Sequence, residues 1–327
     1  MDEILHNLFP FRCAMKDLLM LFGVTLAKRC NKRQKRIFYS QATPFFQKLG
    51  YKIEYQESQS RFNQISNIFI GNLAKAHTVV LCPYDTPTTS LLPFKYFPFN
   101  LESNLRQEYI NLALNSLIYA LCGGLLFYFI YYVSGFSPVL KVIGTILLAL
   151  LLLFSYSLIE GLPNPINFNK NSASVALLAS LAEKKAYDNN YCFILLDKNA
   201  NSSAGFKLLA TEERLKNKFL IYLDCLAFGE KITCVHKQET NPEARKLVEC
   251  LQDLNLLDKV IDGERVKDTN LQFFPKMVHL CVGTIEKKKF VVLNTRSKKD
   301  FQVDIPRLEK IRDGLLKFLE DNHETVI

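Results

Sequence analysis

The hydrophobic pattern of the chain changes abruptly near its middle. No charged residue lies in 109–140 or in 142–159. Each stretch is close to or above the roughly 20 apolar residues that a helix needs to cross a bilayer core. The sequence Ser-Gly-Phe-Ser-Pro at 134–138 separates them and is typical of a turn. The pattern predicts a transmembrane hairpin at 108–160. The alternative is a buried helical pair, but core helices rarely run this long without a charge.

Outside the hairpin, short apolar runs alternate with amphipathic segments, which predicts strands alternating with helices. The predicted strands lie at 51–57, 67–73, 77–82, 191–197, 218–226, 231–236, 277–283 and 289–294. The predicted helices lie at 171–186, 203–215, 241–256 and 305–320. This alternation indicates an α/β fold with a mainly parallel or mixed sheet and helices on both faces.

The same pattern predicts how the chain is divided. We expect one α/β domain built from 51–100 and 164–327, with the hairpin inserted into it. An N-terminal helical segment is expected at 1–50. Within that segment an apolar run at 18–27 precedes 27–36, which holds six basic residues. This predicts either an interfacial helix trailed by a basic patch or a core helix followed by a solvated loop.

The composition supports a membrane-anchored protein with a basic body. Hydrophobic residues make up 49% of the 327 residues, and the formal net charge is +9. Only Lys141 lies beside the turn between the spans, so the positive-inside rule predicts that the body and both termini are cytoplasmic. The expected partner is the lipid bilayer, and anionic lipid suits the charge. No nucleic-acid partner is expected, because the basic run lacks interleaved aromatics. Nine cysteines without a CxxC pair are typical of reduced thiols.

Several predicted strands end in a polar side chain. These residues are Asp85, Asp197, Asp224 and Asn294. In open α/β sheets the ligand crevice lies beyond the carboxyl ends of the strands, so we expect these side chains to border one crevice.

Five short motifs occur in order at strand and helix boundaries. They are Pro-Tyr-Asp-Thr at 83–86, Lys-Asn-Ser-Ala-Ser at 170–174, Asp-Lys-Asn-Ala at 197–200, Tyr-Leu-Asp-Cys-Leu at 222–226, and the stretch 293–320 with Thr295 and Asp300 ahead of its helix. In this order the chain resembles the co-catalytic di-zinc aminopeptidase family, whose fold also includes glutaminyl cyclases and the protease-like domain of transferrin receptor. The resemblance covers about 51–320 outside the hairpin.

The resemblance implies that most metal-site positions of the family carry other residues here. Pro83 stands where the family has a ligand His, and Lys170 stands where it has the Asp that bridges two zinc ions. Asn199 and Ala200 occupy the positions of the catalytic Glu and of the ligand Glu next to it. Asn294 occupies the position of the late ligand His. A lysine beside two dications would replace electrostatic attraction by repulsion.

Two acidic residues of the family's metal-site motifs are present in this sequence. The resemblance makes Asp224 a retained ligand position and Asp85 the residue that supports the first ligand. We expect both to pair with Lys170 instead of holding metal, so no catalytic residue, metal or cofactor is expected. This predicts a membrane-anchored, zinc-peptidase-like protein that binds or scaffolds a protein or peptide. The alternative is an active membrane-bound metallopeptidase or aminopeptidase with a rearranged zinc site, built with other residues near strand ends, namely Cys82, Cys225, His236 and His279.

Overall fold

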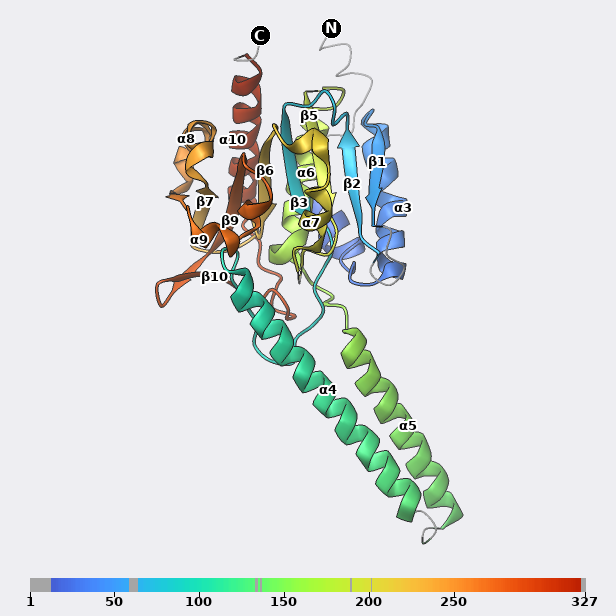
Figure 1. The fold of residues 1–327 in the computed structure, drawn as a ribbon. Coiled ribbons are helices and arrows are strands. Elements are labelled where there is room, and N and C mark those ends of the chain that lie inside the picture. The colour runs from blue at the N-terminus through green and yellow to red at the C-terminus, as the bar shows by residue number, and fades with distance from the viewer. Residues whose placement is uncertain are drawn as a thin grey trace.

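The structure is a computed structural model that describes residues 13–58, 64–132, 135, 137–188, 190–200 and 202–324. A central sheet lies between layers of helices, and two long helices extend from one end of it (Figure 1). The strands are β1 (Ile53–Glu57), β2 (Ser66–Gly71), β3 (Thr78–Pro83), β4 (Lys95–Tyr96), β5 (Tyr191–Leu196), β6 (Phe219–Asp224), β7 (Lys231–His236), β8 (Leu256–Val260), β9 (Met277–Glu286) and β10 (Lys289–Leu293).

The sheet is mixed. Its order is β1-β2-β5-β3-β6-β9-β10-β4, with β7 and β8 branching from β9. The four central strands β5, β3, β6 and β9 are parallel, and the outer pairs β1–β2, β2–β5, β9–β10 and β10–β4 are antiparallel. Parallel neighbours bring the ends of β3, β5 and β6 to one edge of the sheet.

Helices cover both faces of the sheet. One face packs against α2 (Met15–Met20), α3 (Lys32–Lys48), α6 (Ala173–Lys184), α8 (Asn241–Cys250) and α10 (Ile305–Glu324). The other face packs against α7 (Ala204–Leu209) and the short turn Asn270–Phe273, and α9 (Glu264–Lys267) lies beside that turn. Along β3, Val80 and Cys82 enter the first core cluster whereas Val79 and Leu81 enter the second. This alternation is the period of a strand buried on both faces, and it confirms the predicted fold class.

The N-terminal apolar run lies in the core. Leu18 and Leu19 of α2 and Phe22 of the following π-helical turn, Leu21–Thr25, are buried in the same cluster as α6. The core-helix alternative is therefore correct for 18–27, because these side chains cover the first face of the sheet. The solvated loop that it placed after the helix is wrong, since α3 begins at Lys32 and both Arg29 and Lys35 are buried.

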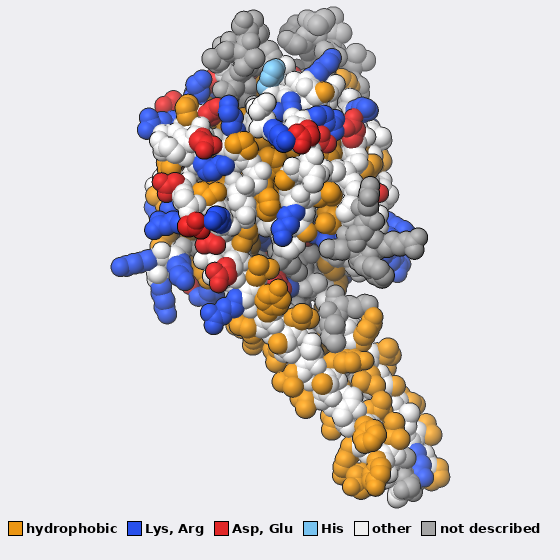
Figure 2. Space-filling model, in the orientation of Figure 1, with side chains coloured by type: hydrophobic (Ala, Val, Ile, Leu, Met, Phe, Trp, Pro, Cys, Tyr) orange, Lys and Arg blue, Asp and Glu red, His pale blue; other side chains and the backbone are white. Residues whose placement is uncertain are grey.

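The two uncharged stretches form α4 (Leu101–Tyr132) and α5 (Pro138–Glu160). Their exposed side chains are almost all hydrophobic, whereas charged side chains cover the body (Figure 2). By length and composition both helices could cross a membrane. α4 begins at Leu101, seven residues before the predicted start of the hairpin, because its first two turns pack on the body.

Several elements differ from the predicted pattern. The helix expected at 203–215 stops at Leu209, and the helix expected at 241–256 stops at Cys250. The two strands β4 and β8 were not predicted. A left-handed Asn255, with φ of 49°, turns the chain out of the helical path and into β8.

Candidate functional site

A buried ion pair lies where β6 ends. Lys170 Nζ donates to Asp224 Oδ1 over 3.2 Å, and both side chains are almost fully buried. Tyr96 Oη donates to Asp224 Oδ2 over 2.6 Å, and the Lys170 ammonium lies 3.4 Å from the centre of the Tyr96 ring. The carboxylate also accepts from Cys225 Sγ over 3.2 Å. The lysine therefore has both a counter-ion and an aromatic face.

Local structure places each member of this cluster. Asp224 is the last residue of β6, and Cys225 follows in a left-handed conformation with φ of 53°, which turns the chain sharply at the strand end. Lys170 lies in a π-helical turn, Phe168–Ser172, that leads into α6. Tyr96 comes from β4, a two-residue strand held antiparallel on β10. Three distant segments thus converge on one carboxylate.

The ion pair keeps both groups charged. Burial alone would raise the pKa of the Asp224 carboxyl, but Lys170, His279 and the Tyr96 hydroxyl outweigh burial and hold that pKa well below its ordinary value. Burial would likewise lower the pKa of Lys170, yet Asp224 raises it above its ordinary value. His279 Nε2 lies 3.6 Å from Asp224 Oδ2, and burial lowers the pKa of the imidazole.

Asp85 belongs to a second cluster at the same edge. Its Oδ1 accepts the backbone N–H of Asn199 over 3.0 Å, and both carboxylate oxygens accept the N–H of Ala200. Pro83 ends β3 with Leu196 of β5 as its register partner. Among the hydrogen bonds and ion pairs of the described residues, none joins Asp85 to Lys170. The expected pairing of Lys170 with both acids is therefore wrong for Asp85, whose carboxylate instead accepts backbone N–H groups from the loop after β5.

Among the described residues, no hydrogen bond or ion pair joins Asn294 to either cluster. It follows β10 in a left-handed conformation, with φ of 63°, and lines a cavity of about 130 Å³ together with Asp300. Burial raises the pKa of Asp300 to about 8, although its two oxygens accept the backbone N–H groups of Asn169 and Lys170. The structure thus brings together Lys170 and Asp224, and separately Asp85, Asn199 and Ala200, whereas Asn294 joins neither set.

These residues do not fit a zinc centre. Both oxygens of Asp224 are engaged, Oδ1 by Lys170 and Cys225 and Oδ2 by Tyr96. The described part of the chain contains no group of three or more His, Cys, Asp or Glu side chains arranged to hold a metal ion. A dication beside Asp224 would meet the Lys170 ammonium in a buried, low-dielectric setting, where like charges repel strongly.

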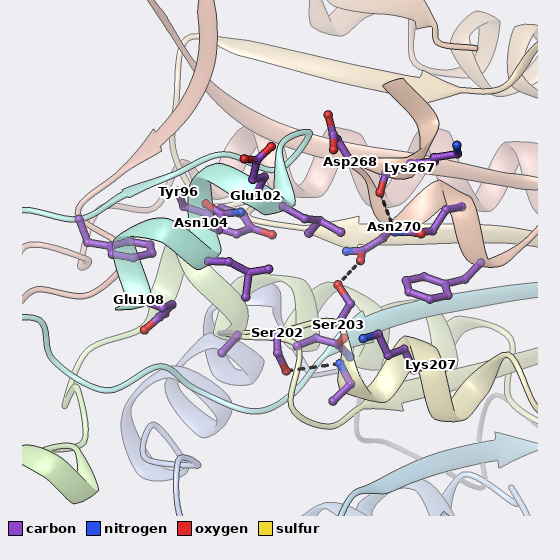
Figure 3. A pocket seen from close by; sticks show the side chains of 18 residues that line it. Tyr96, Glu102, Asn104, Glu108, Ser202, Ser203, Lys207, Lys267, Asp268 and Asn270 are labelled. Carbon is purple, nitrogen blue, oxygen red and sulfur yellow. Dashed lines mark hydrogen bonds between the residues drawn. The ribbon is translucent and has the colours of Figure 1, made fainter. Parts of the chain in front are cut away.

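A cavity of about 470 Å³ opens beside the Asp85 cluster, between the body and the first two turns of α4. Its lining combines apolar side chains, such as Phe94, Leu105 and Phe273, with charged ones of both signs, namely Glu102 from α4 and Lys207, Lys267 and Asp268 from the body (Figure 3). Asn199 and Ala200 also line it, and the Oδ1 atom of Asn199 is buried without a hydrogen-bond partner.

The sequence did not predict the role of Tyr96, nor that Lys35 and Arg29 are buried. Lys35 forms an ion pair with Asp197, and Arg29 is fully buried with its guanidinium bonded to backbone carbonyls and a hydroxyl. Both lie in the basic run that follows a core helix. Their position beside buried segments could have indicated that these two cations are buried and paired. Tyr96 left no such signal, because β4 is too short to show a strand pattern.

The chain has a mixed α/β fold that is also found in solved glutaminyl cyclases and in a zinc-dependent exopeptidase. Among solved structures, a glutaminyl cyclase from Porphyromonas gingivalis is similar, with a TM-score of 0.54, 9% identity, and 94% of this chain and 95% of that chain covered. A Zn-dependent exopeptidase from Parabacteroides distasonis has a TM-score of 0.54 and 11% identity, over 93% of this chain and 94% of that chain. The LapA aminopeptidase from Legionella pneumophila has a TM-score of 0.55 and 8% identity, over 94% of this chain and 70% of that chain.

At these identities the likeness establishes the fold. No protein-family model and no curated protein sequence matches the chain. The structural matches confirm the fold that the sequence resemblance implied.

Proposed function

We propose that this protein is a membrane-anchored, non-catalytic member of the zinc-peptidase-like fold, with a binding or scaffolding role. The observation that supports it is the buried Lys170–Asp224 ion pair, closed by Tyr96. The resemblance assigns these two positions to a bridging carboxylate and a zinc ligand. A lysine that neutralises the remaining carboxylate supplies internally the positive charge that metal supplies in zinc peptidases.

The binding role belongs to the cavity of about 470 Å³ beside α4. It lies at the carboxyl edge of the sheet, where α/β proteins bind their ligands, and it combines cationic and anionic side chains. A short peptide or a loop of a partner protein presents donors and acceptors of both kinds. Because α4 forms one wall, such a partner would bind next to the membrane surface.

Metal analysis of the full-length protein in detergent tests this function. We expect less than one zinc per chain after purification without chelator, and no chelator-sensitive aminopeptidase or glutaminyl cyclase activity. The matched variant is Asp224→Asn, which should leave any residual zinc unchanged, since Asp224 holds Lys170 and not metal.

The alternative function is an active membrane-bound metallopeptidase with a rearranged site. The observation in its favour is that Asp85 and Asp224 match the acids of the family's metal site. Stoichiometric zinc that disappears in Asp224→Asn, together with hydrolysis that chelator abolishes, would establish that alternative and overturn the non-catalytic function.

A further inference from the structure

A second cavity at the carboxyl edge of the sheet has more cations than acids in its lining. Its volume is about 440 Å³, and it lies where α3 begins and where β1 and β5 end. Its charged lining consists of four cations and two acids, namely Lys32, Lys35, Arg36, Lys198, Glu57 and Asp197. Because Asp197 is engaged by Lys35, the cavity has an excess of positive charge.

Two cations of this cavity, Lys35 and Lys198, are close enough to repel each other. Lys35 is nine-tenths buried, and Arg36 and Lys32 stand on the exposed face of the same helix turn. Burial and the neighbouring Lys35 both lower the pKa of Lys198. An anion placed among these side chains would relieve that repulsion, and its oxygens would accept charge-assisted hydrogen bonds.

The basic cavity faces the side of the body from which the hairpin leaves. Lys198 lines it, and the next residue, Asn199, lines the cavity that α4 closes. Both cavities therefore lie at the same edge of the sheet, and α4 and α5 extend from that end of the body (Figure 1). If the hairpin crosses a bilayer, the cavity lies near the head groups of the leaflet that the hairpin enters.

Exposed apolar side chains adjoin the cations on this face. Val24 is 53% exposed and Ile37 is 51% exposed. They line a shallow cavity of about 330 Å³ together with Lys28 and Pro165, and Pro165 follows α5 by five residues. Apolar side chains next to lysine and arginine are typical of surfaces that rest on a membrane. The apolar surface is thus continuous with the place where the hairpin returns to the body.

We propose that the cavity lined by Lys32, Lys35, Arg36 and Lys198 binds the phosphate group of one anionic phospholipid from that leaflet. Lysine and arginine are the side chains that recognise phosphate oxygens, and a volume of about 440 Å³ suits a small polar head group. The proposal rests on membrane insertion of the hairpin, which is part of the proposed function, but not on the lack of catalysis.

Lipid titration of the full-length protein, followed by native mass spectrometry in a neutral detergent, tests the site. The probe is phosphatidylglycerol, with phosphatidylcholine as the zwitterionic comparison. The variant is Lys32→Gln/Arg36→Gln, whose two side chains are exposed and are not needed for the core. The matched control is Lys48→Gln/Lys75→Gln, which removes the same charge from exposed positions outside the cavity, Lys48 at the other end of α3.

We expect the wild type to retain one phosphatidylglycerol in preference to phosphatidylcholine. Its affinity should fall roughly tenfold or more in Lys32→Gln/Arg36→Gln, since each basic residue near anionic lipid contributes about 1 kcal/mol. The control variant should bind as the wild type does. Circular dichroism and melting of each variant verify that it is folded, and the single variant Arg36→Gln replaces the pair if the pair does not fold.

Three results would overturn the lipid site. Equal affinity in the wild type and in Lys32→Gln/Arg36→Gln would exclude the cavity. An equal loss in the control variant would show attraction to net charge alone. In the third result, inorganic phosphate binds with the same dependence on Lys32 and Arg36 and with the same affinity as the lipid. The ligand would then be free phosphate. If the protein still fractionates with membranes while the lipid site fails, membrane anchoring stands and only the lipid proposal falls.

Discussion

At the scale of single residues, the Lys170–Asp224 pair is stabilised by what surrounds it. An isolated ion pair gains little net free energy when both charges leave water, because desolvation offsets the attraction. Here Tyr96 and Cys225 donate to the carboxylate, and the Tyr96 ring faces the ammonium. Removing one charge alone would leave its partner buried and uncompensated.

A double-mutant cycle on this pair tests that interdependence. We expect Lys170→Met and Asp224→Asn each to lower the free energy of unfolding by about 3–5 kcal/mol, whereas Lys170→Met/Asp224→Asn recovers a large part of the loss. The measurement is denaturant unfolding of the full-length protein in detergent. Losses that simply add in the double variant would show that the two side chains do not interact.

The pair also predicts how stability depends on acid. Because the folded-state pKa of Asp224 lies below its unfolded value, the ionised carboxylate contributes stability that is present above about pH 4 and is lost as the pH falls through the folded pKa. Lys170→Met/Asp224→Asn should therefore lose less stability than the wild type below pH 4. An identical acid dependence in both proteins would argue against a lowered pKa.

Sequence reasoning located some of these contacts and not others. The proximity of Lys170 and Asp224 could be expected, since the resemblance placed both at one site and a buried lysine needs a counter-ion. The partners of Asp85 could not, because they are backbone N–H groups of Asn199 and Ala200 whose direction depends on the loop after β5. Backbone donors have no sequence signature.

At the scale of elements, Arg29 joins the N-terminal segment to the sheet. Its guanidinium donates to the carbonyls of Phe22 and Leu26, to that of Tyr84 after β3, and to the hydroxyl of Ser172 at the start of α6. Burial lowers the pKa of Arg29 to about 10, so the side chain stays charged at neutral pH. One planar group thus satisfies acceptors from three segments.

Replacing this guanidinium by an ammonium should loosen the N-terminal segment. In Arg29→Lys a single nitrogen cannot reach all four acceptors, so we expect a loss of about 2–4 kcal/mol in unfolding free energy. Hydrogen exchange should accelerate most in α2 and in Leu21–Thr25. The control is Arg33→Lys, an exposed position of α3, which should exchange as the wild type does. Equal protection in Arg29→Lys would show that packing alone fixes the segment.

The elements themselves were largely readable from the sequence. Strands β3, β5 and β7 follow apolar runs and lie within one residue of their predicted bounds. β8 was hidden because it is mostly exposed and because its leucines continue the helical spacing of α8. β4 was hidden because only pairing with the distant β10 makes its two residues a strand. A local hydrophobic pattern predicts which side chains are buried. An edge strand instead forms by pairing with a strand far away in the sequence, which a local pattern does not show.

At the scale of the whole molecule, both large cavities lie at the same end of the sheet as the hairpin. The ends of β3, β5 and β6, both large cavities, and the first turns of α4 all lie at one end of the sheet, while α10 ends at the far end (Figure 1). The excess of lysine and arginine outside the hairpin predicts that this body lies on the cytoplasmic side. Protease accessibility in sealed vesicles would test that orientation.

The body should not depend on the hairpin for its stability. None of the residues in 109–160 belongs to the hydrophobic core clusters of the described chain. The first two turns of α4 do contact the body, since the N–H of Leu101 donates to the carbonyl of Asp268 over 2.8 Å and Glu108 forms an ion pair with the buried Arg296.

We therefore expect that replacing 109–160 by a short Gly/Ser linker leaves a protein that stays in solution without detergent and unfolds in one cooperative transition. Removing 101–163 instead should lower its melting temperature, because Arg296 then loses its counter-ion. Calorimetry of the two truncated proteins measures the difference, and aggregation or gradual unfolding of the first would show that the hairpin is part of the fold.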